Sequence, residues 1–446
     1  MKLSSFLRTL LSRAAWAALA VTPLVQAAPV IQHWQTAGGA RVYFVESRAL
    51  PIVDVQVDFS AGSAYDPAEK GGLASLTRGV LDLGAGELDE NAIAGRLADL
   101  GAQLGGGADL DRASVSLRTL ADETKREPAL AILRSVLQAP RFAPEVIERE
   151  RARRSAALKD ALTRPDTLAA RAFWAALYPE HPYGRQTTPD GLNALTRADV
   201  QAFYAAHYRA ERATVTLVGD LSRAQAETIA ASLVEGLPQG AAAGSSLAAP
   251  QGYAPGETRI AHPSAQAHVY LGLPAIRRGD PDFFPLIVGN YTLGSGGFVS
   301  RLMKEVREKR GYAYSVYSSF SPLAQPGPFQ IVLQTKGAQA DDALAVAREV
   351  LARFVAEGPS AAELKAAKQN LVGGFPLRLD SNRKILDNVA LIGFYGLPLD
   401  YLDRYAANVE RVSAADVKAA FARHVALDRL STVVAGGETA AAAPKP

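Results

Sequence analysis

The sequence predicts an α+β fold of two similar halves, each an antiparallel-rich sheet packed with helices and joined by a linker. Three observations predict it: an internal repeat, a linker-like stretch between the copies, and strand patterns followed by helix patterns in each copy. With 446 residues, 48% of them hydrophobic, the chain is long enough for two or three domains with real cores.

The repeat has an offset of 217 residues and places residues 196–219 over 413–436 without a gap. Each copy begins with a helix capped by Thr196 or Ser413 and ends in a β-branched run that favours a buried strand. Upstream, residues 331–375 repeat the pattern of residues 117–160, and each of these segments predicts two helices. The first half opens with a strand at 53–59 and the second with one at 268–273.

Residues 239–256 are the long Gly-, Ala-, Ser- and Pro-rich stretch of the chain, which is typical of a linker. The predicted segments are a signal peptide at 1–28, an N-terminal half at 29–238, the linker at 239–256, a C-terminal half at 257–438 and a disordered tail at 439–446.

The first 28 residues are typical of a cleaved secretory signal. Lys2, Arg8 and Arg13 precede an uncharged run at 14–25 that is too short to span a bilayer, and small residues follow it. A lipid-modified precursor would need a cysteine, and the chain has none. We therefore expect a periplasmic protein, with an uncleaved anchor as the alternative.

Removing the signal deletes three positive charges and leaves 45 basic against 45 acidic residues. A protein that binds nucleic acid or an anionic membrane needs a surplus of Lys and Arg on one face, so neither partner is expected. The absence of cysteine excludes disulfides, thiolate zinc sites and a thiol nucleophile.

Several motifs occur together in the expected halves. The first half carries Ala61-Gly-Ser63, Gly72-Leu-Ala74 and His181-Pro-Tyr-Gly184, and in the second Leu293-Gly-Ser-Gly-Gly297 precedes a block from Ser300 to Tyr314. Together they resemble the pitrilysin, insulinase and mitochondrial processing peptidase family of inverted-zincin metallopeptidases. The resemblance implies that the two halves close as a clamshell.

Active members of that family hold zinc with two histidines one helical turn apart and a distant glutamate, and a further glutamate acts as general base. None of these residue types stands at the matching positions. The resemblance places there Ser75, Arg78, Gly79 and approximately Ala157, or Ala156 or Leu158 after a one-residue slip. The fixed charge of Arg78 would also repel a dication, so we expect no zinc on this chain.

The six histidines do not suggest another metal site. His262 and His268 are too far apart along an extended segment to chelate as a helical pair, and His207 and His424 are repeat equivalents. His181 lies before a proline in a loop. A structural role is expected for each of these histidines.

The resemblance implies a role for an arginine and a tyrosine seven residues apart, which bind the substrate backbone and stabilise the transition state opposite the zinc. Arg307 and Tyr314 match them. The sequence predicts a helix with an apolar stripe before Arg307, a C-terminal cap at Gly311 and a strand at 312–318. The stripe consists of Phe298, Val299, Leu302, Met303 and Val306.

The run Gly294, Ser295, Gly296 and Gly297 predicts a turn before that helix, and as a substrate-binding segment it would let a peptide backbone approach closely. Ser381 and Lys384 form a Ser-x-x-Lys pattern, but the companion motifs of that enzyme class are missing, which favours a surface helix. There is no Gly-x-Ser-x-Gly motif that would support a serine hydrolase.

These observations favour the zinc-less subunit of a bacterial two-chain peptidase, in which a homologous partner brings His-x-x-Glu-His and zinc and both chains bind a peptide. The alternative is a non-enzymatic peptide-binding or scaffold protein. A stand-alone hydrolase is a third possibility, and no convergent nucleophile and base support it.

Overall fold

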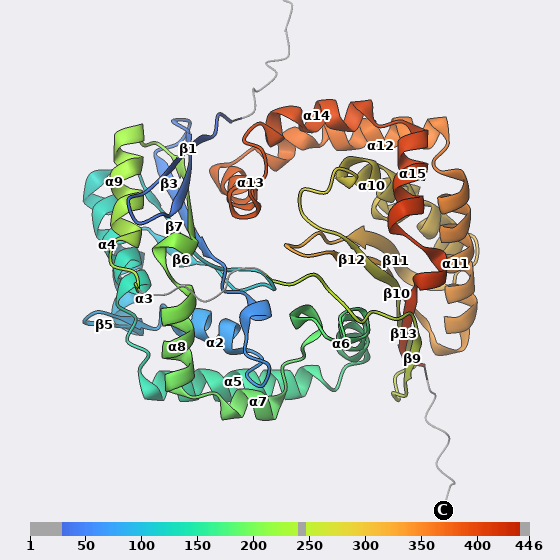
Figure 1. The fold of residues 1–446 in the computed structure, drawn as a ribbon, viewed down its shortest axis with the longest axis horizontal. Coiled ribbons are helices and arrows are strands. Elements are labelled where there is room, and N and C mark those ends of the chain that lie inside the picture. Colours follow the sequence, from blue (N-terminus) through green and yellow to red (C-terminus); the bar gives the residue numbers. More distant parts are fainter. Residues whose placement is uncertain (1–28, 240–246, 438–446) are drawn as a thin grey trace, which may run out of the picture.

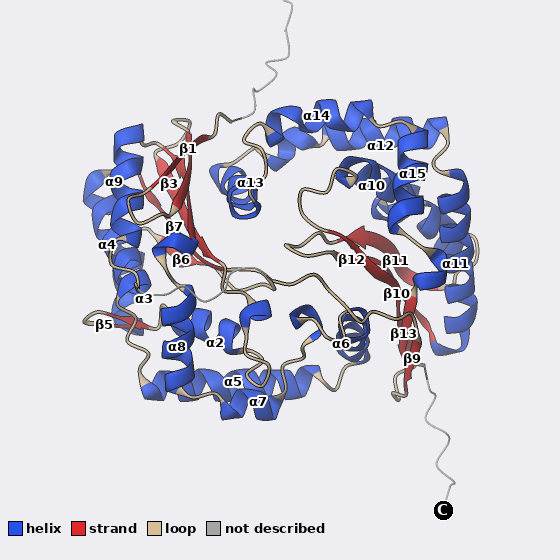
Figure 2. Cartoon of the chain, in the orientation of Figure 1, coloured by secondary structure: helices blue, strands red, loops and turns tan. Residues whose placement is uncertain are grey.

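The computed structural model describes residues 29–239 and 247–437 (Figures 1 and 2). The predicted signal peptide, the predicted tail and residues 240–246 of the predicted linker lie outside them. Two sheets, each backed by helices, stand at opposite sides of the molecule, which confirms the predicted fold class. Within the described residues, no helix has both the length and the apolar character needed to cross a lipid bilayer.

The N-terminal half is built on a six-stranded sheet in the order β1-β2-β8-β3-β7-β6. All its neighbouring strands are antiparallel except the β2–β8 pair. The strands are β1 (Gln32–Gln35), β2 (Arg41–Glu46), β3 (Ile52–Phe59), β6 (Gln103–Gly105), β7 (Ala113–Leu120) and β8 (Ala213–Gly219). A separate small hairpin joins β4 (Gly84–Ala85) and β5 (Leu88–Asp89).

Helices of this half share one hydrophobic core with the sheet. The helices of the N-terminal half are α2 (Leu73–Val80), α3 (Glu90–Asp99), α4 (Glu123–Gln138), α5 (Pro144–Ala161), α6 (Pro165–Leu177), α7 (Pro189–Ala194), α8 (Arg197–His207) and α9 (Arg223–Val234).

The C-terminal half has a five-stranded sheet in the order β11-β12-β10-β13-β9, with a core of its own. The strands are β9 (Glu257–Ile260), β10 (Gln266–Ile276), β11 (Ala313–Phe320), β12 (Gly327–Lys336) and β13 (Ser431–Gly436). The α-helices are α10 (Phe283–Asn290), α11 (Ala340–Glu357), α12 (Ala361–Gly373), α13 (Asn382–Tyr395), α14 (Tyr401–Arg411) and α15 (Ala414–His424).

The repeat is confirmed element by element. The offset of 217 carries α8 onto α15 residue for residue, and α4, α5 and α6 begin at positions equivalent to the first residues of α11, α12 and α13. The caps explain the match: Thr196 and Ser413 each close a capping box with the aspartate three residues later. The same local signal therefore starts the same helix in both halves.

One helix of each half packs against the sheet of the other half (Figure 1). Helix α6 packs against β10 and β13, with Phe173 and Leu177 in one cluster with Val433. Its repeat equivalent α13 packs against β8, β3 and β2, where Leu386 and Val389 join Val218. The two halves are consequently joined by exchanged helices as well as by the linker.

A buried carboxylate strengthens this junction. Asp111, 1% exposed, accepts hydrogen bonds from the hydroxyls of Tyr183 (2.5 Å) and Tyr395 (2.8 Å) and from the backbone N–H of Ala324 (2.9 Å). Asp111 and Tyr183 belong to the N-terminal half, whereas Tyr395 and Ala324 belong to the C-terminal half. One side chain thus connects three segments that are far apart in the sequence.

Two local predictions were wrong. Phe298 and Val299 do not continue the apolar stripe of the helix before Arg307; they are 64% and 53% exposed in a 3₁₀ turn. Gly297 has a φ of 62° that breaks the helix ahead of them. Ser381 caps α13, which is an interdomain helix with a buried face rather than a surface helix.

Candidate functional site

Ser75, Arg78 and Gly79, which the resemblance places at the metal-site positions of the family, lie on α2. Five apolar or small side chains of α2 are buried in the core, and Asp66 fixes the start of the helix by accepting from the backbone N–H groups of Gly72 and Ala74, both at 2.7 Å. Burial raises the pKa of Asp66 to about 7. Ser75 and Gly79, one turn apart, lie partly exposed on the opposite face.

Arg78 is a buried anchor and not a free cation. It is 4% exposed and donates to the backbone oxygens of Ser114 (2.5 Å) in β7 and Gly105 (2.6 Å) in β6, with Asp82 Oδ1 at 3.3 Å. The side chain at the general-base position therefore fastens α2 to the edge of the sheet. It offers no basic atom for activating water.

A second arginine reaches the same place from α5. Arg154 Nη1 donates to Ser75 Oγ at 2.9 Å, and a Cβ atom built at Gly79 would lie 1.8 Å from Arg154 Nη2. Ala157, the approximate position of the distant glutamate, is exposed on α5. The sequence comparison did not single out Arg154. In the sequence, Arg154 is distinguished only as one of several arginines in the run 148–154, which does not indicate a contact with α2.

The residues around α2 do not fit a zinc ion. Ser75 Oγ already accepts from a guanidinium, Gly79 has no ligand atom, and Arg78 and Arg154 both bring positive charge. A tetrahedral zinc site needs three or four convergent imidazole, thiolate or carboxylate ligands. No step of a reaction can be assigned to a metal held by these residues.

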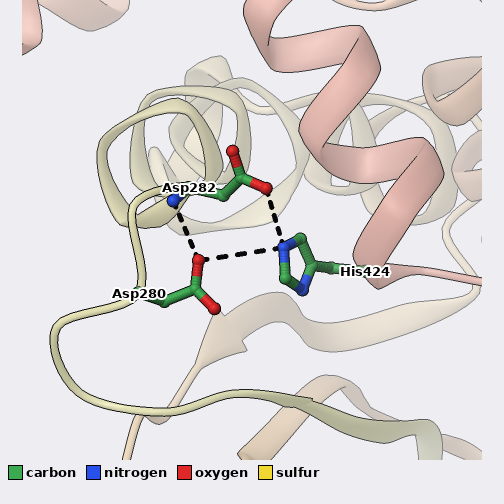
Figure 3. A group of neighbouring side chains, drawn as sticks. All are labelled: Asp280, Asp282 and His424. Carbon is green, nitrogen blue, oxygen red and sulfur yellow. Dashed lines mark hydrogen bonds and ion pairs between the residues drawn. The ribbon is translucent and has the colours of Figure 1, made fainter.

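One other group of metal-ligating residue types occurs among the described residues, and it is drawn in Figure 3. His424 Nε2 lies 2.9 Å from Asp282 and 3.9 Å from Asp280. Arg423 also binds both oxygens of Asp282, at 2.7 and 2.8 Å, and holds the pKa of that carboxyl below its usual range, with help from His424. The group therefore ties the end of α15 to the start of α10.

The histidines have the structural roles expected of them. His207 is buried between Phe203 and Tyr65, and burial lowers its pKa to about 4. His181 accepts from the N–H of Tyr183, and its Nε2 lies 2.9 Å from the carbonyl oxygen of Ala248.

Arg307 lies on an exposed turn of the C-terminal half. It belongs to a π-helical segment, Met303–Glu308, a wider turn that is often found at functional sites. Its guanidinium carbon is 5.3 Å from the centroid of the Phe298 ring, and among the described residues it has no carboxylate partner. Lys309 and Arg310 on the same segment both pair with Glu305.

Tyr314 is placed by an irregularity of the edge strand β11. The register against β12 shifts between Ala313 and Ser315, so Tyr314 is the extra residue of a β-bulge. The bulge breaks the alternation of buried and exposed side chains and leaves Tyr314 52% exposed. Its hydroxyl has no hydrogen-bond partner in the described part of the chain. Gly311, with a φ of 66°, ends the preceding segment as predicted.

The glycine run contributes to packing as well as to the surface. Gly294 is buried, and a Cβ atom there would lie 2.3 Å from Ser318 Oγ, so this glycine lets the π-helical turn Tyr291–Ser295 contact β11. A Cβ atom at Gly296 would lie 2.5 Å from the carbonyl oxygen of Tyr291. Ser295 and Gly297 are exposed and Gly296 is partly exposed, so these three members of the run are open to a ligand.

Comparison with known proteins agrees with this geometry. The family model described as insulinase (peptidase family M16) matches residues 41–191, and the one described as peptidase M16 inactive domain matches residues 194–371. A crystal structure titled peptidase M16 inactive domain, from Pseudomonas fluorescens, is 38% identical; the match covers 93% of this chain and 100% of that one, with a TM-score of 0.88. The chain belongs to peptidase family M16.

Two other similar proteins extend the comparison. The non-peptidase homolog YmxG of Helicobacter pylori is 26% identical over 398 residues, which are 88% of this chain and 91% of that protein. The periplasmic protease PqqL of Escherichia coli, at 17% identity, shares the fold with a TM-score of 0.78, and the match covers 46% of its chain. This chain is thus similar over most of its length both to a structure titled an M16 inactive domain and to a protein named a non-peptidase homolog.

Proposed function

We propose that this M16 member is the non-zinc subunit of a heteromeric metallopeptidase of the bacterial periplasm. In this proposal a homologous partner carries His-x-x-Glu-His and zinc. This chain supplies Arg307 and Tyr314, which donate to the oxyanion that forms when the partner's activated water attacks a peptide carbonyl.

The observation that carries the proposal is the contrast between the two places where family machinery would lie. At the first place, Ser75 is bound by Arg154, and Arg78 is bound to backbone carbonyls. Arg307 and Tyr314 at the second place are exposed and have no carboxylate or hydroxyl partner among the described residues. An arginine fork and a phenol are both hydrogen-bond donors to an anionic oxygen. Of these two sites, it is the one at Arg307 and Tyr314 that has donor groups available to bind a ligand.

Peptide binding is the second part of the proposal. Strand β11 pairs with β12 alone, so one edge of it is free of other strands of the described chain. Asn290 covers part of that edge by donating to the carbonyl of Ser318 at 3.0 Å. An extended peptide could add to the remaining stretch from Ala313 to Tyr317, beside Arg307 and Tyr314.

The periplasmic location rests on the basic and apolar pattern of residues 1–28. Cell fractionation followed by N-terminal sequencing tests it. A mature chain that starts close to residue 29 in the periplasmic fraction supports the proposal, and an intact N-terminus in the membrane fraction supports the uncleaved anchor.

Reconstitution tests the function. The chain from residue 29 is purified alone and together with a homologous His-x-x-Glu-His protein of the same organism, and zinc content and cleavage of a quenched peptide library are measured. Chelator-sensitive cleavage by the mixture, well above that of either chain, supports the proposal. Zinc-dependent activity of this chain alone would overturn it. If the mixture binds peptide but does not cleave it, the result would favour a non-enzymatic peptide-binding protein.

A further inference from the structure

The side chains that replaced the metal ligands are fitted to one another. The guanidinium of Arg154 lies between Ser75 and Gly79, the two α2 positions that in a zinc-binding member would point imidazoles at the ion. The hydroxyl of Ser75 accepts from Nη1, and Gly79 leaves open the volume that Nη2 occupies. Independent loss of each ligand would not predict such matched contacts.

The guanidinium of Arg78 points away from Ser75 and Gly79 and leaves the space between them to Arg154. Its three nitrogens are directed to the carbonyls of Ser114 and Gly105 and to Asp82. Arg154 is therefore the arginine that occupies the space between Ser75 and Gly79. All three altered positions of α2 have a physical explanation once Arg154 is included.

The environment of Arg154 is that of a fixed internal cation. Its Nε is buried and has no partner in the described residues, and no carboxylate lies within ion-pair distance there. Burial lowers the pKa of Arg154; the charge of Glu150 opposes this with a smaller effect, and the charges of Arg153 and Arg78 each lower it by less than Glu150 raises it. A dication brought to the same place would meet this charge at a few ångströms.

We propose that Arg154 has taken the place of the metal ion as the fixed cation of this site, where it links α5 to α2 and excludes a metal. This assignment concerns residues of this chain only and does not depend on the proposed partner. It means that restoring the two histidines is not enough to restore zinc binding.

Metal binding is the first test. The variant S75H/G79H restores the histidine pair and keeps Arg154, whereas S75H/G79H/R154E replaces the guanidinium with a carboxylate on the same α5 position. Zinc affinity is measured by competition with a fluorescent chelator, and the geometry by the visible spectrum of Co²⁺. We expect the triple variant to bind one zinc per chain at least about tenfold more tightly than the double variant.

Equal affinities, or tighter binding with Arg154 present, would overturn the proposal. Failure of both variants to bind zinc would also count against it, because removal of the cation should free the site.

A double-mutant cycle tests the same contact without metal. Gly79→Ala should lower the midpoint of urea unfolding when Arg154 is present, since the new Cβ displaces the guanidinium from Ser75. With Arg154→Met the same change should raise the midpoint, because alanine favours a helix over glycine. Arg154→Lys replaces the methionine variant if that variant does not fold.

Gly95 of α3 provides the matched control, because no atom lies within 4 Å of a Cβ built there. Gly95→Ala should raise the midpoint in both backgrounds. If Gly79→Ala behaves like Gly95→Ala in the presence of Arg154, the guanidinium does not occupy the assigned place.

Discussion

Arg78 and Arg307 have the same side chain and opposite surroundings. Arg78 is buried against two carbonyl oxygens and a carboxylate, whereas Arg307 is exposed beside Phe298. A buried arginine with all its nitrogens engaged holds elements together. An exposed one without a carboxylate keeps its donors available to a ligand. Arg78 therefore stabilises the fold, whereas the guanidinium of Arg307 is open to a ligand.

Loss of either donor should impair the assembled peptidase. Arg307→Ala or Tyr314→Phe is expected to reduce kcat/KM of the reconstituted complex by about 100-fold, because each removes a donor to the transition-state oxyanion. Steady-state cleavage of a quenched peptide measures this, with assembly checked by size-exclusion chromatography.

Neighbouring residues provide the controls for these two variants. Arg310→Ala removes a charge from the same segment that is already paired with Glu305, and Tyr317→Phe removes a hydroxyl from the same strand, where Tyr317 is 43% exposed. Both should retain rates close to those of the unaltered complex. Equal rates in all four variants would remove Arg307 and Tyr314 from the site.

Asp58 should make stability depend on pH. It is fully buried beside Gln56 and Arg112, with Asp109 and Asp387 nearby, and burial raises its pKa from 3.8 to about 6. Because the folded state holds the proton more tightly than the unfolded chain, the stabilisation is complete below about pH 4 and is lost as the pH rises through about 6.

Asp58→Asn should abolish this dependence. Relative to the variant, the unaltered protein is expected to lose about 2 kcal/mol of unfolding free energy between pH 4.5 and 8. Urea unfolding across this range measures it, and parallel pH profiles of the two proteins would contradict the assignment.

At the level of elements, the sequence predicted what local signals determine. Capping boxes at Thr196 and Ser413 and β-branched runs before Gly219 and Gly436 place α8, α15, β8 and β13 where the repeat requires them. Between Tyr291 and Glu308 the sequence predicted a turn and a helix but not their π-helical and 3₁₀ form, because such turns have no simple periodicity.

The candidate site was predictable only in part. The motif block identifies Arg307 and Tyr314, and the missing histidines identify the altered metal positions. Arg154 could not be found in this way, because its contact with Ser75 joins residues 79 positions apart on two helices. A side chain of that length can reach several places, and only the packing of α5 on α2 selects one.

Helix α13 lies so close to the N-terminal sheet that adding one methyl group at their contact should lower the stability of the protein. A Cβ atom at Gly393 would lie 2.6 Å from Tyr43 Cδ2 and 3.0 Å from Thr214 Cγ2. Gly393→Ala is therefore expected to lower the unfolding free energy by about 1–3 kcal/mol, although alanine is the better helix former. Urea unfolding measures the change.

Gly373, at the end of α12, has no atom within 4 Å of such a Cβ and serves as the control. Gly373→Ala should leave stability within about 0.5 kcal/mol of the original. A Gly393→Ala variant that is as stable as this control would show that α13 does not rest on the sheet.

At the scale of the whole molecule, Asp111 should keep the two halves together. Asp111→Ala leaves Tyr183, Tyr395 and the N–H of Ala324 without their shared acceptor, which is expected to cost about 2–4 kcal/mol. Small-angle X-ray scattering should show a larger radius of gyration, since the bonds to Tyr395 and Ala324 cross between the halves.

Tyr183 takes part in the same junction, because its hydroxyl donates to Asp111 and also accepts from the backbone N–H of Gln325 in the C-terminal half at 3.1 Å. Tyr183→Phe should therefore reduce stability and increase the radius of gyration, as Tyr395→Phe does. An unchanged scattering profile for Asp111→Ala would show that the exchanged helices suffice to hold the halves.

The exchange of α6 and α13 also governs the order in which the polypeptide can mature. The sheet of the first half presents Tyr43, Val45 and Val218 to a helix that is encoded more than 160 residues after the last of them. During synthesis, that apolar face stays uncovered until residues 382–395 emerge. A fragment truncated before this point would expose a surface prone to aggregation, so the first half is completed only when nearly the whole chain has been delivered.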